Sequence, residues 1–189
     1  MDTYAKNLSD ANIFRGIYTG VASALTSHKV TGTATTGLTS KGQSTIGNVL
    51  AIMPFSDDSN FLATLSVDSH IHHTSSDASG TTGVEFPTKS GIDVGLGYCF
   101  SKKFIVDAGV GMQLMNTSTT NLVTGGSGDS QRLPALDVFI QGISKMGDKT
   151  LTSYKYETFI SKKKTFSTAP GSLGAKGSSH RLHVSTKFN

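Results

Sequence analysis

Two short histidine-containing patterns hold the residues of this chain that are best suited to chemistry. The first is HIHH, in which His70 and His72 stand two residues apart and so share one face of a strand. Two imidazoles on one face can bind a metal such as zinc, but a zinc site needs at least three protein ligands. No third ligand stands at a suitable spacing, so we expect no metal here and no cofactor in the protein.

The second pattern is His183-Val184-Ser185, which puts a histidine and a serine on one face of a strand. A serine nucleophile needs a base within hydrogen-bonding reach and a further group that orients the base. The few residues that follow Ser185 include no acidic one. We therefore expect His183 and Ser185 to be packing residues, and we expect no enzyme activity.

The composition indicates a chain made mainly of β-strands. Its 189 residues include 21 Gly but only 4 Pro, and 16% are charged, which is below the usual quarter. Ser and Thr are abundant, Thr favours strands, and the usual helix formers are scarce. The net charge of +4 is mild and the basic residues are scattered, apart from Lys162–Lys164, so no nucleic-acid partner is expected. No apolar run approaches the roughly 20 residues of a membrane helix.

The stretch SGIDVGLGYCFSKKFIVDAGVGMQL, residues 90–114, alternates with a period of two residues. Ile92 and Val94 fall on one face, and Asp93, Gly95 and Gly97 fall on the other. Such alternation predicts strands with one apolar face. The opposite face is poor in the Lys and Glu that a soluble protein presents to water. This pattern favours an apolar face that is turned outward.

The same alternation recurs along the chain with turn residues between the segments. It predicts a polar N-terminal segment at residues 1–12 and a single all-β domain at residues 13–189. The expected strands cover residues 13–25, 45–55, 61–73, 91–100, 104–115, 136–146, 151–163 and 180–188. Short connections alternate with long ones. An antiparallel up-and-down barrel of eight such strands would have its short turns at one end and its long loops at the other, as transmembrane barrels do.

On these features the chain resembles the small eight-stranded bacterial outer-membrane β-barrels, the OmpA/OmpX-like group of the porin-like superfamily. The resemblance rests on GIDVGLGYCFSKKFIVDAGVGMQL, a strand–turn–strand unit, and on the alternation of Leu182, Val184, Thr186 and Phe188 in the last strand. It implies a transmembrane barrel in the outer membrane of a Gram-negative bacterium, with the signal peptide, which this chain does not show, already removed. It also implies a structural or adhesin-like role through long polar extracellular loops.

The resemblance further implies the partners of the protein, the residues that face lipid and the residues that fill the lumen. The partners are membrane lipid and lipopolysaccharide, the barrel-assembly machinery during insertion, and a host or cell-surface partner at the loops. The residues expected to face lipid are Ile92, Val94, Leu96, Tyr98, Phe100, Val106, Val110, Met112, Leu114, Leu182, Val184 and Phe188. The residues expected to form a polar network in the lumen are Asp68, Asp93, Asp107, Asp137, Gln141, Lys155, Glu157 and Lys187.

Two alternative interpretations remain open from the sequence. A soluble, lipocalin-like barrel would reverse the two faces and hold a small apolar ligand inside. An outer-membrane lipid hydrolase would use His183 and Ser185, whose spacing looks like the His-x-Ser pair of PagL-type lipid A deacylases. Those enzymes are also eight-stranded barrels, but their site faces lipid, whereas both residues here are expected on the lumen side.

Overall fold

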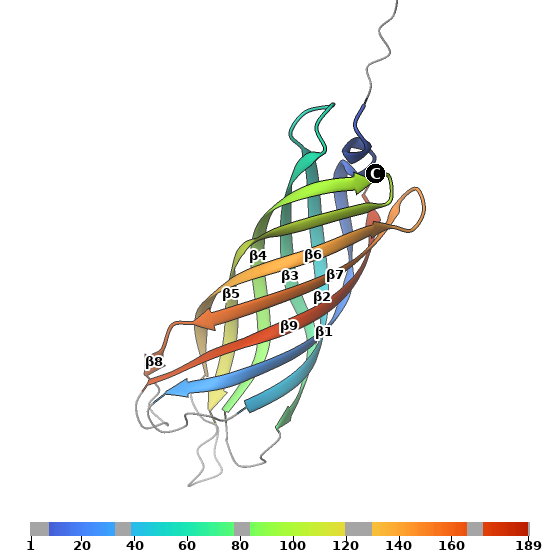
Figure 1. The fold of residues 1–189 in the computed structure, drawn as a ribbon. Coiled ribbons are helices and arrows are strands. Elements are labelled where there is room, and N and C mark those ends of the chain that lie inside the picture. Colours follow the sequence, from blue (N-terminus) through green and yellow to red (C-terminus); the bar gives the residue numbers. More distant parts are fainter. Residues whose placement is uncertain (1–7, 33–38, 78–83, 120–129, 166–171, 189) are drawn as a thin grey trace, which may run out of the picture.

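The computed structural model describes residues 8–32, 39–77, 84–119, 130–165 and 172–188, which form a closed β-barrel (Figure 1). Its long strands are β1 Gly16–Gly32, β2 Thr39–Pro54, β3 Phe61–Asp77, β4 Val84–Ser101, β5 Phe104–Thr119, β6 Ser130–Lys145, β7 Thr150–Ser161 and β9 Ser172–Lys187. The two-residue strand β8, Lys164–Thr165, pairs beside β9, and a 3-10 helix, η1, covers Asp10–Phe14. Among the described residues, no helix is long and apolar enough to cross a membrane.

The long strands form one up-and-down sheet. Each pairs antiparallel with the next in sequence, and the sheet closes on itself where β1 pairs with β9. This closure removes the free edges that an open sheet would present. The predicted eight-stranded antiparallel barrel is therefore confirmed.

The strands wind around the barrel axis with a regular stagger. Following paired residues around the wall from Tyr18 of β1, through every long strand in turn, leads back to β1 at His28. One circuit in the direction β1 to β9 thus climbs ten residues along β1. Such a stagger in eight strands goes with a tilt of about 40° and an interior just wide enough for side chains to fill.

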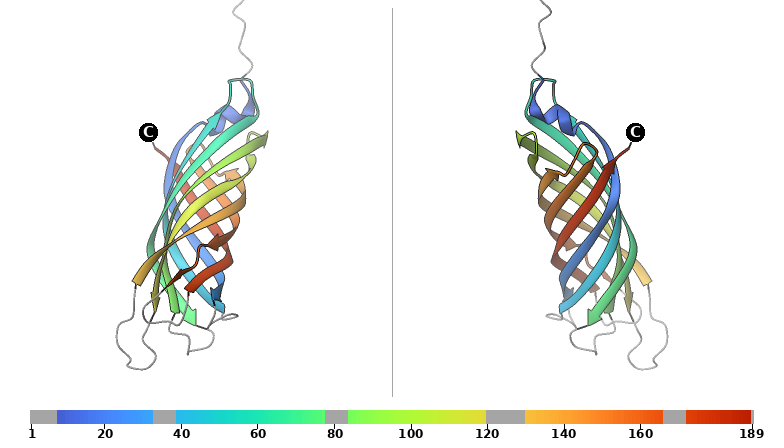
Figure 2. Two further views of the ribbon diagram at one scale, coloured as in Figure 1. Left: turned by 90° about the vertical axis from the view of Figure 1, so that its left-hand side faces the viewer. Right: turned by 90° about the vertical axis from the view of Figure 1, so that its right-hand side faces the viewer.

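The two ends of the barrel differ. The connections 55–60, 102–103 and 146–149 lie at one end, together with η1 and the last residues of β9. We call this the turn end; it is uppermost in Figures 1 and 2. The other connections join strands at the opposite end, which we call the loop end. The turns 102–103 and 146–149 are short, as predicted, but the connections 33–38 and 78–83 have six residues each, the same as 55–60, so the two ends differ less than predicted.

The strands reach further toward the loop end than the sequence predicted. Strand β4 begins at Val84 rather than at residue 91, and β9 begins at Ser172 rather than at residue 180. The segment added to β9, SLGAKGSS, is rich in Ser and Gly, and the segment added to β4, VEFPTKS, has only two alternating apolar residues before Pro87, so neither carries a periodic apolar signal. The first predicted strand began too early, because Asp10–Phe14 is helical and the chain turns into β1 at Gly16, whose φ is 150°.

Candidate functional site: apolar wall and ion-paired lumen

The outer wall of the barrel carries apolar side chains from every long strand. Leu96 is 67% exposed and Val110 is 58% exposed. The other exposed aliphatic residues of the wall include Ile17, Val21, Leu25, Val49, Met53, Leu65, Val67, Ile71, Ile92, Val94, Met112, Leu114, Leu136, Val138, Ile140, Ile160, Leu182 and Val184. A continuous apolar exterior is what a barrel wall needs in order to contact the hydrocarbon of a bilayer.

Aromatic rings gather on the outer wall at the turn end. The Phe61 and Tyr98 rings meet edge-on with centroids 5.0 Å apart, and Tyr98 and Phe100 meet in the same way at 5.0 Å. Phe100 and Phe104 continue the row at 6.4 Å. Rings in this position are typical of the aromatic girdle at a membrane interface.

The lumen face differs from the wall, because many polar and charged side chains are buried in it. The buried polar residues of the long strands are Ser44, Asn48, Thr64, Ser66, Asp68, Asp93, Asp107, Gln113, Asp137, Gln141, Ser153, Lys155, Glu157, Ser161, Ser179, Arg181, His183 and Ser185. Charges in such a place are tolerated only when they are paired and hydrogen-bonded.

Arg181 is the cation that spans the lumen. Its Nη2 donates to Oε1 of Glu157 at 2.6 Å, and its Nη1 donates to Oδ2 of Asp68. Asn48 donates from Nδ2 to the other oxygen of Asp68, Oδ1, at 2.6 Å. Strand β9 is therefore tied to its neighbour β7 and, across the interior, to β3 and β2.

Lys155 is the second cation of this network. Its Nζ donates to Oδ2 of Asp93 and lies 3.5 Å from Oε2 of Glu157. The same ammonium group lies 4.5 Å from the centroid of the Phe139 ring, so it gains a cation–π contact as well. Glu157 thus joins the Arg181 and Lys155 pairs into one network, which we call the lumen network.

Two small residues make room for that aromatic partner. A Cβ added at Gly95 would lie 3.0 Å from Cζ of Phe139, and one added at Gly109 would lie 2.8 Å from Cε1 of the same ring. The Gly109 addition would also approach the backbone of β4, at 2.7 Å from the Cα of Gly95. The glycines of the alternating stretch therefore let the large Phe139 side chain lie inside a narrow barrel.

The turn end of the lumen is filled by an apolar cluster. Ala11 and Phe14 of η1 are fully buried there, together with Tyr18, Leu50, Ile52, Leu62, Cys99, Ile105, Ile143 and Leu151. The Tyr18 hydroxyl donates to the Phe14 carbonyl at 2.9 Å. Outside the cluster, Arg15 and Asp57 form an ion pair at 2.8 Å that fastens η1 to the connection between β2 and β3. Helix η1 therefore closes the lumen at this end.

The structure brings most of the predicted lumen residues together. Asp68, Asp93, Asp107, Asp137, Gln141, Lys155 and Glu157 are all buried in the interior. Asp107 accepts a hydrogen bond from Oγ1 of Thr64 at 2.7 Å, and Gln141 donates to Oγ of Ser153 at 2.6 Å. Lys187 stands apart from them, half-buried at the turn end with its Nζ 6.0 Å from the Tyr18 ring centroid.

The predicted lipid-facing residues all lie on the outer wall. Every one of them is exposed except Val106, which is half-buried. The two faces of the stretch at residues 90–114 are therefore arranged as its alternation indicated, with Asp93, Gly95 and Cys99 buried inside.

The His-x-Ser pair lies in the lumen rather than against lipid. His183 and Ser185 are each 3% exposed. The Nδ1 atom of His183 lies 3.1 Å from Oγ of Ser153, a serine of the neighbouring strand β7, so the histidine is hydrogen-bonded to a serine other than Ser185. A nucleophile at Ser185 would have no access to a lipid of the surrounding membrane.

The histidines of HIHH sit at an irregularity of the sheet. His70 pairs with Ile46 and His72 pairs with Thr45, so Ile71 opposes no residue of β2 and forms a β-bulge. A bulge interrupts the alternation on which the shared-face argument depends. Within the described residues, no group of three or more His, Cys, Asp or Glu side chains could hold a metal ion.

Arg181 is the main residue that the sequence reasoning missed. It stands two positions before His183, so the alternation that placed His183 and Ser185 inside also places Arg181 there. Asn48 could have been found in the same way from its neighbours in β2. Thr64, Ser66 and Ser153 could also be placed inside by their spacing from Asp68 and Lys155, although their residue types give no signal, because small hydroxyl residues occur on both faces of this barrel.

An apolar wall around an ion-paired polar lumen defines the small membrane-spanning type of β-barrel. No protein-family model and no curated protein sequence matches this chain. Among solved structures, Neisserial surface protein A (NspA) superposes with a TM-score of 0.55 at 14% identity, covering 92% of this chain and 97% of that one. The shared fold is thus that of the small eight-stranded outer-membrane barrels.

Two further structures resemble the chain more distantly. The outer membrane protein OprG of Pseudomonas aeruginosa has a TM-score of 0.49 at 10% identity, covering 92% of this chain and 94% of its own. Ail, the attachment invasion locus protein of Yersinia pestis, solved with the heparin analogue sucrose octasulfate, has a TM-score of 0.43 at 9% identity, covering 92% of this chain and 99% of its own.

The lumen network yields a prediction about stability. Arg181→Met keeps the approximate length of the side chain but removes the ion-pair partner of Asp68 and leaves Glu157 with Lys155 alone, so we expect the free energy of unfolding to fall by about 3–5 kcal/mol. The matched control is Lys187→Met, which removes a half-buried lysine outside the network and should cost less than about 1 kcal/mol. Urea unfolding in phosphatidylcholine vesicles, followed by circular dichroism, measures both. Equal losses for the two variants would contradict the assignment.

Proposed function

We propose that the protein is an integral outer-membrane β-barrel with a structural or surface-interaction role, exercised through its loop end. The observation that carries the proposal is the inverted burial of the sheet, with leucine, isoleucine and valine outside and the lumen network inside. A barrel in water requires the opposite arrangement. The lipocalin-like alternative needs the apolar face to enclose a ligand, and the apolar face lies outside.

The dimensions of the strands support a membrane position. A strand that crosses the hydrocarbon core needs about 10 residues, and strands β1 to β6 have 16 to 18. Their excess length lies at the loop end, beyond the band of apolar side chains on the outer wall, which we call the apolar belt. There the exposed wall becomes polar, with residues such as Lys29, Lys41 and Lys176.

The polar wall at the loop end supports an interaction role. The strands continue past the apolar belt as a rigid ladder, which would hold binding surfaces clear of the bilayer. Loops that a rigid scaffold positions are the usual place for recognition. The filled lumen supports the same role, because η1 and the lumen network occupy the path that a solute would need.

The lipid hydrolase alternative gains no support from the site. His183 and Ser185 lie among the buried residues of the lumen network, and His183 is hydrogen-bonded to Ser153. No described contact gives Ser185 a base. A reaction on a membrane lipid would require both residues on the outer wall.

The membrane position is tested by adding a charge to the wall. Val94→Arg puts a guanidinium into the apolar belt, and we expect the free energy of unfolding in phosphatidylcholine vesicles to fall by about 2–4 kcal/mol. Gln43→Arg adds the same group on the polar part of β2 and should change the stability by less than about 1 kcal/mol. A protein that tolerates Arg at Val94 as well as at Gln43 would not have this face in lipid.

The interaction role is tested on intact bacteria. A Gram-negative strain that carries the protein in its outer membrane is compared with the vector strain for retention on epithelial monolayers. A variant with residues 120–129 replaced by a short Gly-Ser turn controls for the barrel itself. We expect retention to rise several-fold with the full chain and to fall back with the variant, at equal amounts of folded protein. Retention no higher than that of the vector strain would refute an adhesin-like role while leaving the membrane barrel intact.

A further inference from the structure

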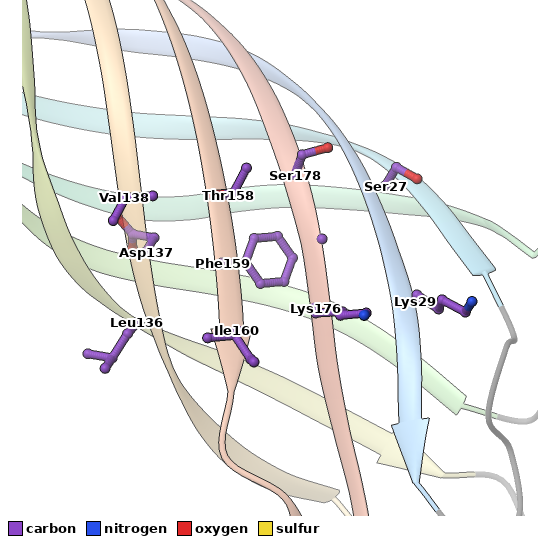
Figure 3. A pocket seen from close by; sticks show the side chains of 11 residues that line it. Ser27, Lys29, Leu136, Asp137, Val138, Thr158, Phe159, Ile160, Lys176 and Ser178 are labelled. Carbon is purple, nitrogen blue, oxygen red and sulfur yellow. The ribbon is translucent and has the colours of Figure 1, made fainter.

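A groove runs across the outer wall of the barrel over β6, β7, β9 and β1. Its volume is about 670 Å³. Figure 3 shows Leu136, Val138 and Ile160 toward one end of the groove and Lys29 and Lys176 toward the other. The groove therefore has an apolar end and a basic end on a surface that the proposed function turns toward the membrane.

The register of the strands explains why the wall is hollow here. One row across the groove has only short hydroxyl side chains on β7, β9 and β1. Thr158 is paired with Ser178, which is paired in turn with Ser27. Long side chains form the rows on both sides. The row nearer the loop end is Leu136, Ile160, Lys176 and Lys29, and the row nearer the turn end is Ile140, Tyr156, His180 and Leu25.

The stagger of the barrel also fixes how the groove is inclined. A path along paired residues climbs toward the loop end in the direction from β6 to β1, by about 3 Å per strand at the usual spacing and tilt. The apolar end on β6 therefore lies deeper in the apolar belt than the basic end on β1. This is the direction in which a lipid lies, with its chains in the hydrocarbon and its head group at the interface.

The two lysines at the basic end of the groove face each other directly. Lys29 of β1 is paired with Lys176 of β9, and both side chains are exposed. Like charges directly opposite each other destabilise an antiparallel pair. No carboxylate of the described residues forms an ion pair with either lysine. An anion held between them would remove the repulsion.

We propose that this groove binds an anionic, phosphate-bearing lipid of the surrounding membrane, with the phosphate between Lys29 and Lys176. The acyl chains lie against Leu136, Val138 and Ile160. The hydroxyls of Ser27 and Ser178 lie in the next row on the same two strands as the lysines, at the basic end, where they donate hydrogen bonds to head-group oxygens. The inference rests on the proposed membrane position and adds to it a specific site, which a uniform apolar wall would not have.

The test uses the full chain in dodecyl maltoside micelles, titrated with lipid A or with phosphatidylcholine and observed by native mass spectrometry. We expect lipid A to bind at one site and phosphatidylcholine to bind much more weakly. Lys29→Gln combined with Lys176→Gln should lower the affinity for lipid A at least tenfold. Ser178→Phe, which fills the row of short side chains without changing the charge, should lower it as well.

The matched control is Lys162→Gln combined with Lys163→Gln, which removes the same charge from exposed residues outside the groove. Its affinity for lipid A should stay within about twofold of the original. Equal losses in the two double variants would overturn the proposal in favour of a diffuse charge effect. Binding of soluble dextran sulfate through Lys29 and Lys176, without binding of lipid A, would overturn it in favour of a soluble polyanion.

A negative result for lipid binding at the groove can be distinguished from a negative result for the membrane barrel. Each variant is also tested for refolding that requires detergent and for a change in gel mobility on boiling. Variants that keep both properties but show no lipid preference refute the groove alone. Loss of both properties in the unmodified chain would refute the membrane barrel itself.

Discussion

The pairing of β1 with β9 is the constraint on which the rest of the structure depends. Hydrocarbon offers no hydrogen-bonding partner, so a sheet inside a bilayer must satisfy every backbone N–H and C=O within itself. Closure does this for eight strands, and the fifteen-residue register of β1 on β9 runs from Tyr18–Lys187 to Gly32–Leu173. The outer wall can then be apolar throughout, and the polar side chains are left to the narrow interior.

The lumen network follows from that division of the two faces. The interior of an eight-stranded barrel must be filled, and here Arg181, Lys155 and Glu157 fill its centre. A register slip of one residue would exchange the faces of a strand and carry these charges into lipid, at a cost of several kcal/mol. The buried ions therefore oppose every pairing that is out of register by an odd number of residues, in addition to whatever they add to the stability of the correct one.

The sequence predicted the fold where the two faces of a strand differ most. Strands β4 and β5 alternate between large apolar residues and Gly or Asp, and both their faces and the turn between them were predicted. The loop-end parts of the strands were missed, because a ladder of Ser, Thr and Gly has no contrast between its faces. The bulge at Ile71 was also invisible, since it changes the register without changing the composition. Arg181 could have been placed by alternation, whereas its pairing with Asp68 on β3 depends on which strands lie opposite in the closed barrel.

Refolding with and without detergent tests whether the apolar face of the sheet points outward. The chain is refolded from denaturant with and without detergent, and each sample is examined by circular dichroism and by gel electrophoresis before and after boiling. We expect a β-sheet spectrum only in the presence of detergent, together with a change in mobility on boiling. A soluble monomer with the same spectrum in plain buffer would contradict it, because the apolar face would then be inside.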